Sequence, residues 1–149
     1  MRNNLPVSDR EFVFPYGKTI VSYANLQGKI TKVNEGFIEL SGYSMRELLG
    51  QPHNILRHPD MPPEVFSEMW HGLKKGHAWS GLIKNRRKNG DFYWVRANIS
   101  PLVDGTGYVS VRVEASREDI AAAEALYARI RKNACVLPID GLTPFEVKI

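Results

Sequence analysis

Two β-type segments joined by a tight turn constrain the fold of this chain more than any other feature. Residues 79–86 and 92–102 are rich in β-branched and aromatic side chains, and the short connection between them contains Asn89-Gly90. An Asn-Gly pair in that position is a strong signal of a β-hairpin, because both residues tolerate the positive φ angles of a tight turn. The pair therefore predicts two neighbouring antiparallel strands in the second half of the chain.

The segments on either side of this hairpin predict the rest of the architecture. Residues 19–24 and 29–33 indicate an earlier hairpin, and residues 108–115 indicate a fifth strand. Short helices are expected between residues 34 and 76, where capping residues, prolines and an apolar stripe occur. This order predicts an α+β fold, in which a five-stranded antiparallel sheet carries short helices on one face and encloses a ligand pocket.

Capping signals mark where these helices begin. Asn34 is expected to cap a short helix, and Ser44 opens a capping box for one further helical turn. Pro62 and Pro63 suit the first turn of a longer helix that Gly76 ends.

Changes in pattern along the chain indicate four parts. Residues 1–17 are polar and rich in turn formers, and we expect them to form a mobile N-terminal arm. Residues 18–116 hold the strands and short helices of the globular domain. Residues 117–132 predict an exit helix with one apolar stripe, and residues 133–149 lose this pattern and are expected to form a tail.

The composition argues against several classes of function. The single cysteine excludes a disulfide framework and a CxxC metal site, and we expect no bound metal. No apolar run approaches the roughly 20 residues needed to span a bilayer, and the first residues lack the apolar stretch of a signal peptide, so we expect a cytoplasmic protein without direct membrane insertion. The basic run at residues 84–88 is interpreted as a solvated hairpin tip, not a nucleic-acid surface. No Ser/His/Asp group or carboxylate pair indicates an enzyme.

A loop bounded by prolines, residues 51–63, carries the most distinctive polar side chains. Arg57, His58 and Asp60 follow one another closely within it. Prolines keep the backbone extended, so these groups belong to a shaped loop and not to a helix interior. A cation, an imidazole and a carboxylate at fixed spacing suit a polar ligand that bears phosphate, although a surface loop held by its own salt bridge would have the same composition.

The element order and several sequence blocks resemble PAS sensor domains over residues 19–116, and more closely the N-terminal PAS domain of bacterial aerotaxis receptors. The blocks that carry the closer resemblance are HNILRHPDMP at 53–62 and KNRRKNGDFYWVRAN at 84–98. In that family the domain binds FAD without a covalent bond and reports redox, oxygen or energy status to a chemotaxis signalling module. The resemblance implies the same fold, the same cofactor and the same kind of signalling partner here.

The aerotaxis-receptor resemblance places Arg57, His58 and Asp60 on FAD-binding positions. Arg57 would offer a planar fork to a pyrophosphate, and His58 would offer a donor without a permanent charge. Asp60 would accept from the ribose or adenine or brace Arg57, and its alternative role is that of N-cap for the helix that follows. Asn34 is expected first as a helix cap and second as a ligand contact.

A second resemblance, to flavin-binding light-sensing (LOV) domains, concerns the flavin ring. It places Asn85 at the pyrimidine edge of the ring, and Trp79, on the same strand face, would cover the ring. Alternation along the fifth strand would point its valines inward and Arg112 outward. The light-sensor resemblance implies the reverse, with Arg112 inward and the valines packed under the terminal helix. His53 takes the position of the reactive cysteine of those photosensors and Cys135 lies outside the domain, so we expect no thiol adduct in light.

Other functions stay open at this point. A haem-based oxygen sensor of the same fold would use His53 or His58 as axial ligand, although Arg57 and Asp60 beside His58 argue against it. A flavoenzyme would lack substrate-handling residues, and a ligand-free PAS dimerisation module would leave the polar loop unexplained. The sequence is compatible with a homodimer and with further receptor domains in a longer chain.

Overall fold

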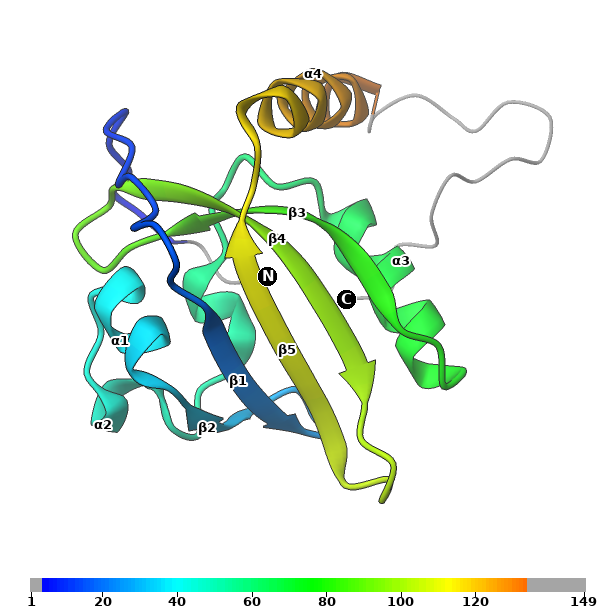
Figure 1. Ribbon diagram of the computed structural model, residues 1–149. Helices are drawn as coiled ribbons and strands as arrows, with labels where there is room; N and C mark the ends of the chain where they lie inside the picture. Colours follow the sequence, from blue (N-terminus) through cyan, green and yellow to red (C-terminus); the bar gives the residue numbers. More distant parts are fainter. Residues whose placement is uncertain (1–3, 134–149) are drawn as a thin grey trace, which may run out of the picture.

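The computed structural model describes residues 4–133, and its central feature is one antiparallel sheet in the order β2-β1-β5-β4-β3 (Figure 1). The strands are β1 Ile20–Asn25, β2 Ile30–Val33, β3 Trp79–Arg86, β4 Phe92–Pro101 and β5 Gly107–Glu114. The helices are α1 Glu35–Ser41, α2 Met45–Leu48, the 3-10 helix η1 His53–Leu56, α3 Pro63–Lys74 and α4 Arg117–Asn133. The predicted α+β class and five-stranded antiparallel sheet are confirmed.

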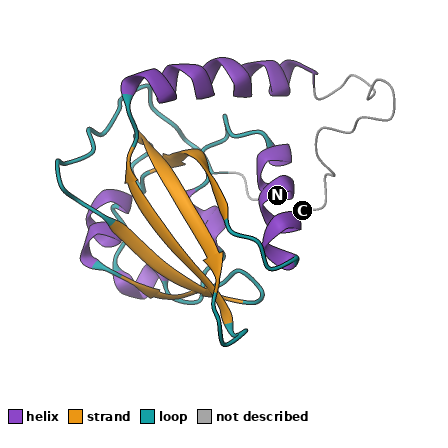
Figure 2. Ribbon diagram, turned by 45° about the vertical axis from the view of Figure 1, so that its right-hand side comes forward, coloured by secondary structure: helices purple, strands orange, loops and turns teal. Residues whose placement is uncertain are grey.

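The two faces of the sheet are covered differently. The short helices and α3 lie on one face, whereas α4 crosses the other (Figures 1 and 2). The Tyr127 ring of α4 stacks on Trp94 with ring centroids 6.2 Å apart, and the Tyr127 hydroxyl donates to the Leu82 carbonyl at 2.6 Å. We call the face under α4 the outer face and the opposite one the inner face.

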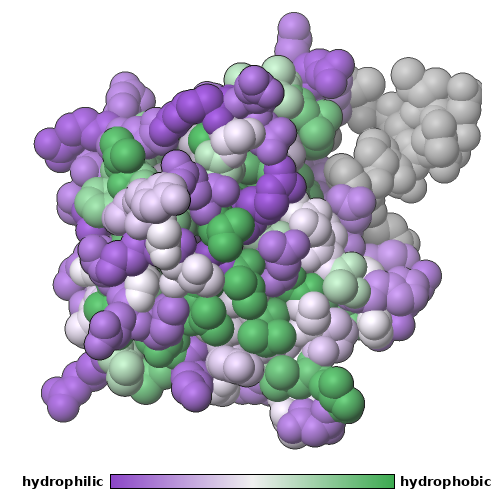
Figure 3. All heavy atoms as spheres, in the orientation of Figure 1, coloured by the Kyte–Doolittle hydropathy of each residue, from purple (hydrophilic) through white to green (hydrophobic). Residues whose placement is uncertain are grey.

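The valines of β5 lie on the outer face, but they are only half-buried there. The resemblance to light-sensing domains placed them under the terminal helix, whereas the contacts described above tie α4 to β3 and β4. Figure 3 accordingly shows apolar side chains along the exposed part of this face. The exit helix itself forms as predicted, and of the predicted tail only Asn133 is among the described residues.

The Asn89-Gly90 hairpin forms as predicted. β3 and β4 pair in register along the whole of β3. Gly90 has a φ of 101°, a left-handed value that favours glycine, and the Arg87 N–H donates to the Asp91 carbonyl at 2.7 Å to close the loop.

Asn34 is a helix cap whose side chain also joins α1 to the sheet. Its Oδ1 accepts from the Phe37 N–H at 3.0 Å and from the Val21 N–H at 3.0 Å. Its Nδ2 donates to the Thr19 carbonyl at 2.9 Å. The capping role predicted for Asn34 is confirmed, and both ends of its amide are used by the protein backbone.

The other predicted helix starts differ in outcome. Ser44 forms the expected capping box with Glu47, and α3 begins with Pro63. The proposed N-cap role of Asp60 is wrong, because Pro62 precedes α3 and no side chain caps this helix. The Asp60 carboxylate instead accepts from Lys84 Nζ at 2.8 Å, since a flexible lysine on β3 reaches it.

The N-terminal segment corrects the expectation of a mobile arm. Asn4 and Phe14 are buried, with 8% and 7% of their surface exposed. The Ser8 N–H donates to the Gly90 carbonyl at 2.9 Å, and the Phe12 N–H donates to the Phe92 carbonyl at 2.7 Å. A segment that pairs with a hairpin edge through a few bonds has no regular hydrophobic period, so its sequence gave no strand signal.

The core fills the space between the inner face of the sheet and the helices, but not completely. Phe37 and Tyr93 are each 1% exposed, and α3 buries the predicted apolar stripe that includes Met69 and Leu73. Between α3, η1 and the sheet the packing leaves a cavity.

Candidate functional site

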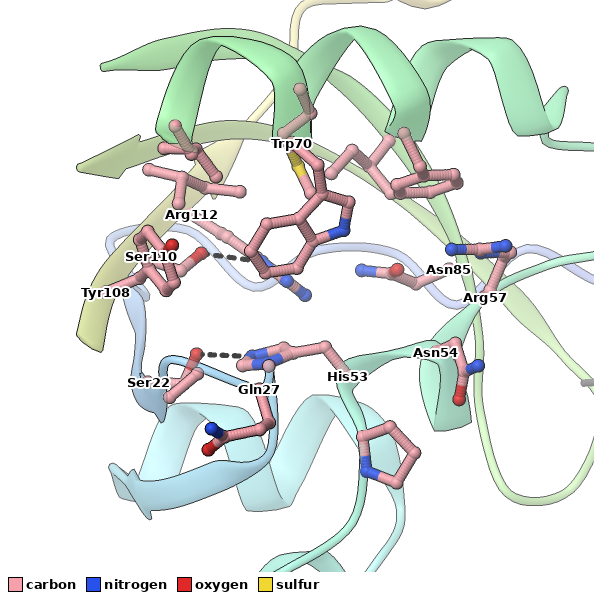
Figure 4. Close-up of a pocket in the computed structure, with 18 residues that line it drawn as sticks. Ser22, Gln27, His53, Asn54, Arg57, Trp70, Asn85, Tyr108, Ser110 and Arg112 are labelled. Carbon is pink, nitrogen blue, oxygen red and sulfur yellow. Dashed lines mark hydrogen bonds between the residues drawn. The ribbon is translucent and has the colours of Figure 1, made fainter. Parts of the chain in front are cut away.

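A cavity of about 230 Å³ lies between the inner face of the sheet and the helices α3 and η1. Figure 4 shows Trp70 of α3 and His53 of η1 on opposite sides of this space. The sheet contributes polar side chains from three strands, Ser22 from β1, Asn85 from β3 and Arg112 from β5. The lining is therefore apolar on the α3 side and polar toward the sheet, which is typical of a small-molecule site.

Arg112 is the most unusual polar side chain of the cavity. It is 5% exposed, and burial lowers the pKa of its guanidinium. Its Nε donates to Ser110 Oγ at 3.1 Å, whereas its Nη1 has no partner among residues 4–133. The inward orientation that the light-sensor resemblance implied is confirmed, and a buried guanidinium with a free N–H favours a ligand with a hydrogen-bond acceptor.

His53 faces the cavity as a neutral imidazole. Burial, together with the charge of Arg112, lowers the pKa of His53 to about 3. Its Nε2 lies 2.9 Å from Ser22 Oγ, so the hydroxyl and the ring share a hydrogen bond (Figure 4). A neutral ring beside a buried guanidinium adds polarity to the cavity without adding positive charge.

Arg57 and Asn85 reach the cavity from two segments that pair with each other. Their backbones form an isolated antiparallel bridge between the motif loop and β3. The Arg57 guanidinium lies over the Phe66 ring at 4.0 Å, and its Nε and Nη1 have no partner within the described part of the chain. Asn85 is 2% exposed, and its Nδ2 likewise lacks a partner there.

His58 and Asp60, expected to bind the ligand beside Arg57, do not line this cavity. His58 is 3% exposed, its Nδ1 accepts from the Asp60 N–H at 3.0 Å, and its ring meets Phe92 edge-on. Burial and the charge of Lys84 lower the pKa of His58 to about 4. Asp60 lies on the side of α4, where Arg131 donates to its carbonyl. The loop therefore divides its polar groups between the cavity and the exit helix.

A family model described as the PAS fold matches residues 30–113 of the 149-residue chain. The matched range contains the helices and strands that supply most of the cavity lining. The chain belongs to the PAS family. The predicted fold and the resemblance to PAS sensor domains are thereby confirmed.

Comparison with known proteins places this PAS domain beside aerotaxis receptors. The aerotaxis receptor of Escherichia coli (strain K12) is 51% identical over 129 residues, which cover 85% of this chain and 24% of the receptor. The nitrogen fixation regulatory protein of Klebsiella pneumoniae is 28% identical over 117 residues, 78% of this chain and 23% of that protein. The chain thus spans about a quarter of the length of these two relatives.

A solved PAS domain from Colwellia psychrerythraea superimposes on this PAS domain with a TM-score of 0.60 and 26% identity, over 70% of this chain and 92% of that one. A LOV domain from the blue-light activated histidine kinase of Erythrobacter litoralis EL346 gives a TM-score of 0.60 at 18% identity, over 66% of this chain and 96% of that one. The second match shows the shared fold alone.

Two expected ligand contacts lie away from the cavity of the PAS domain. Asn34 caps α1, and Trp79 folds its ring over Gly81, where a Cβ atom would lie 2.5 Å from the indole. The glycine therefore makes room for Trp79 itself. Trp70, which the sequence indicated as core or pocket wall, takes the aromatic position instead, with its ring 5.3 Å from that of Tyr108.

Ser22 and Ser110 are site residues that sequence reasoning missed. Ser22 pairs with Ser110 across β1 and β5, and Ile20 pairs with Arg112 one step along the same face. Alternate residues of a strand share a face, so an inward Arg112 implies that Ser110, two residues before it in β5, also points inward. The orientation of Arg112 would therefore have been the signal for Ser110.

Neither a metal site nor a membrane span appears in the part of the chain that the structure describes. Residues 4–133 contain no group of three His, Cys, Asp or Glu side chains that could hold a metal ion. None of their helices combines the length and the apolar character needed to cross a membrane.

Proposed function

We propose that this PAS domain is a sensor module, not an enzyme, that holds FAD in the cavity and reports redox, oxygen or energy status to a chemotaxis signalling output. The observation that carries the proposal is the convergence of buried, unpartnered donors on the cavity, from Arg57, Asn85 and Arg112. A donor left unpaired in a folded protein is costly, so a ligand with several acceptors would relieve that cost.

The residues of the cavity fit a flavin ring. A flavin presents carbonyl oxygens and ring nitrogens along one edge, and Asn85 and Arg112 offer N–H groups to such an edge. Trp70 supplies an aromatic wall for its planar surface. The volume of about 230 Å³ lies below the roughly 300–1,000 Å³ of common ligand sites, and it suits a planar ring system better than a whole dinucleotide.

The electron chemistry would come from the flavin, while the chain would supply orientation and electrostatics. Asn85 carries both a donor and an acceptor on one amide, so it can serve either protonation state of a neighbouring nitrogen. Burial raises the pKa of Tyr93 to about 12, so this hydroxyl keeps its proton. The two positive groups Arg57 and Arg112 favour added negative charge in the cavity.

The output would leave through β3 and α4. Asn85 lines the cavity on the inner face of β3, whereas Leu82 of the same strand accepts from Tyr127 of α4 on the outer face. A shift of β3 caused by Asn85 would therefore act on α4 directly. The partner we propose is a chemotaxis signalling module on the cytoplasmic side, in a longer chain or a homodimer.

The absorption spectrum of the purified protein tests this proposal. We expect flavin bands at about 450 nm, whereas a haem protein would absorb at about 410 nm. Heating then denatures the protein and releases the flavin, and chromatography of the supernatant distinguishes FAD from FMN. The haem alternative has little support, because His58 lies outside the cavity lining and His53 is hydrogen-bonded to Ser22. Recovery of haem, or of FMN alone, would overturn the proposal.

A further inference from the structure

The start of the N-terminal segment contacts the loop that carries Arg57. Asn4 is 8% exposed, and its Nδ2 donates at 2.8 Å to the carbonyl of Asn54 and at 2.8 Å to that of Arg57. The Arg57 N–H also donates to the Asn54 carbonyl at 3.1 Å, which forms the last turn of η1. A side-chain amide nitrogen has two hydrogens, so one Asn4 side chain can hold both carbonyls of this turn.

The opposite side of the same turn faces the cavity. Arg57 projects its guanidinium over Phe66, and its Nε and Nη1 have no partner within residues 4–133. Oδ1 of Asn54, which also lines the cavity, is buried without a partner in the same part of the chain. The turn that Asn4 holds thus presents both an unpaired cation and an unpaired acceptor to a ligand.

We propose that Asn4 is a positioning residue for Arg57, and that ligand binding in the cavity is coupled to docking of residues 4–14. This inference rests on the proposed function. Asn4 does not line the cavity, so its effect on the ligand would pass through the backbone of Arg57.

Other contacts of the segment extend the coupling. Arg86, which follows Asn85 in β3, donates from its Nε to the Pro6 carbonyl at 2.9 Å. Further along, Glu11 forms a two-point ion pair with Arg117, the first residue of α4, at 2.9 and 2.5 Å. The segment therefore touches the ligand-bearing loop at one end and the exit helix at the other.

Coupling of this kind is reciprocal. If docking of the segment favours the binding geometry of Arg57, then the bound ligand must favour docking of the segment by the same factor. The Ser8 and Phe12 amides report docking, because both donate to the β3–β4 hairpin.

A double-mutant cycle tests the positioning role. FAD is titrated into apo protein that carries Asn4→Ala, Arg57→Ala or both. Val13→Ala is the control, because Val13 belongs to the same segment and is 71% exposed. We expect Asn4→Ala to weaken FAD binding about three- to tenfold. In the Arg57→Ala background the same change should cost less than about twofold, since Asn4 acts through Arg57. The control should leave FAD affinity unchanged.

The outcomes separate this inference from the proposed function. Wild-type protein that binds no FAD would overturn the proposed function and this inference with it. If Asn4→Ala binds FAD as tightly as wild-type protein does, the positioning role alone is overturned. The same holds if Asn4→Ala lowers FAD affinity by the same factor in the wild-type and Arg57→Ala proteins. If Asn4→Ala does not fold, hydrogen exchange on wild-type protein decides. Slower exchange of the Ser8 and Phe12 amides with FAD bound is expected, and equal exchange would refute the coupling.

Discussion

Arg57 and Asn85 face each other as a backbone pair and both place their side chains in the cavity. This pair joins the two sequence blocks that resemble aerotaxis receptors, the motif loop and the β3–β4 hairpin. A change in the position of either side chain therefore acts on the other segment through the backbone. The loop and the hairpin form one binding unit, although they are separated by the whole of α3.

Removing the buried charge of Arg112 should affect the apo and FAD-bound forms in opposite directions. Arg112→Met keeps the length of the side chain and removes a buried guanidinium whose Nη1 is unpaired in the described residues. We expect unchanged or higher stability of the apo protein and a loss of FAD affinity of about tenfold to a hundredfold. Thermal melting and FAD titration measure the two effects, with the exposed Arg129→Met as control. A variant that binds FAD like wild type would remove Arg112 from the site.

The three motif-loop residues should separate into two classes. Arg57→Ala is expected to weaken FAD binding by about tenfold or more while the apo domain stays folded. His58→Ala removes a 3%-exposed ring that packs on Phe92, so it should destabilise the apo domain by about 2 kcal/mol or more. Asp60→Ala removes the carboxylate that accepts from Lys84 of β3 but keeps the carbonyl that accepts from Arg131, so it should leave FAD affinity unchanged and cost at most about 1 kcal/mol of stability. Circular dichroism melts and flavin occupancy distinguish these classes, and equal loss of FAD at constant stability in all three would contradict the division.

Protonation of the buried histidines should destabilise the domain in acid. Burial lowers the pKa of His53 to about 3 and that of His58 to about 4, from an ordinary value of 6.5. Between the lowered and the ordinary pKa values, each histidine binds a proton in the unfolded chain but not in the folded domain. The free energy of unfolding should therefore fall as the pH drops below the ordinary value, by at most about 1.4 kcal/mol per pH unit for each histidine.

Urea unfolding across this pH window measures the effect. His58→Asn keeps an acceptor for the Asp60 N–H and should reduce the slope of stability against pH. His71→Asn, which changes an exposed side chain of α3, serves as the control and should leave the slope unchanged. An unaltered slope in His58→Asn would assign the acid sensitivity to other groups.

Illumination should not produce a thiol adduct. His53 lines the cavity, and the light-sensor resemblance gives its position to the reactive cysteine of those photosensors, whereas Cys135 lies outside the described residues. FAD-loaded protein illuminated without oxygen or an electron donor should keep its oxidised spectrum. Reversible formation of a single band at about 390 nm that survives Cys135→Ser would show different site chemistry.

Flavin reduction should change how tightly the terminal segments are held. Tyr127→Phe removes the hydroxyl that donates to Leu82 and should weaken docking of α4 by about 1 kcal/mol. In the wild-type protein, reduction should shift the protection of residues 4–18 or 117–132 by about 1–3 kcal/mol. Hydrogen exchange on oxidised and dithionite-reduced protein measures both. Identical protection in the two redox states would mean that the signal leaves by another surface.

The sequence by itself determined the local structure of this domain. Asn89-Gly90 specified the hairpin, Asn34 and Ser44 specified helix starts, and the apolar stripe of α3 specified the side that it buries. Each of these features depends on residues close together in the chain, so a short window of sequence contains the interactions that decide it. The order of such elements was then sufficient to predict the antiparallel sheet.

Only the tertiary structure decided which polar groups meet in the cavity. Alternation along β5 predicts that Arg112 and the valines occupy opposite faces, but not which face the helices cover. The loop sequence likewise gives no reason why Arg57 enters the cavity while His58 and Asp60 turn toward β4 and α4. Burial of a face, and the docking of Asn4 on a distant turn, depend on contacts between segments far apart in the chain. Local periodicity carries no information about such contacts.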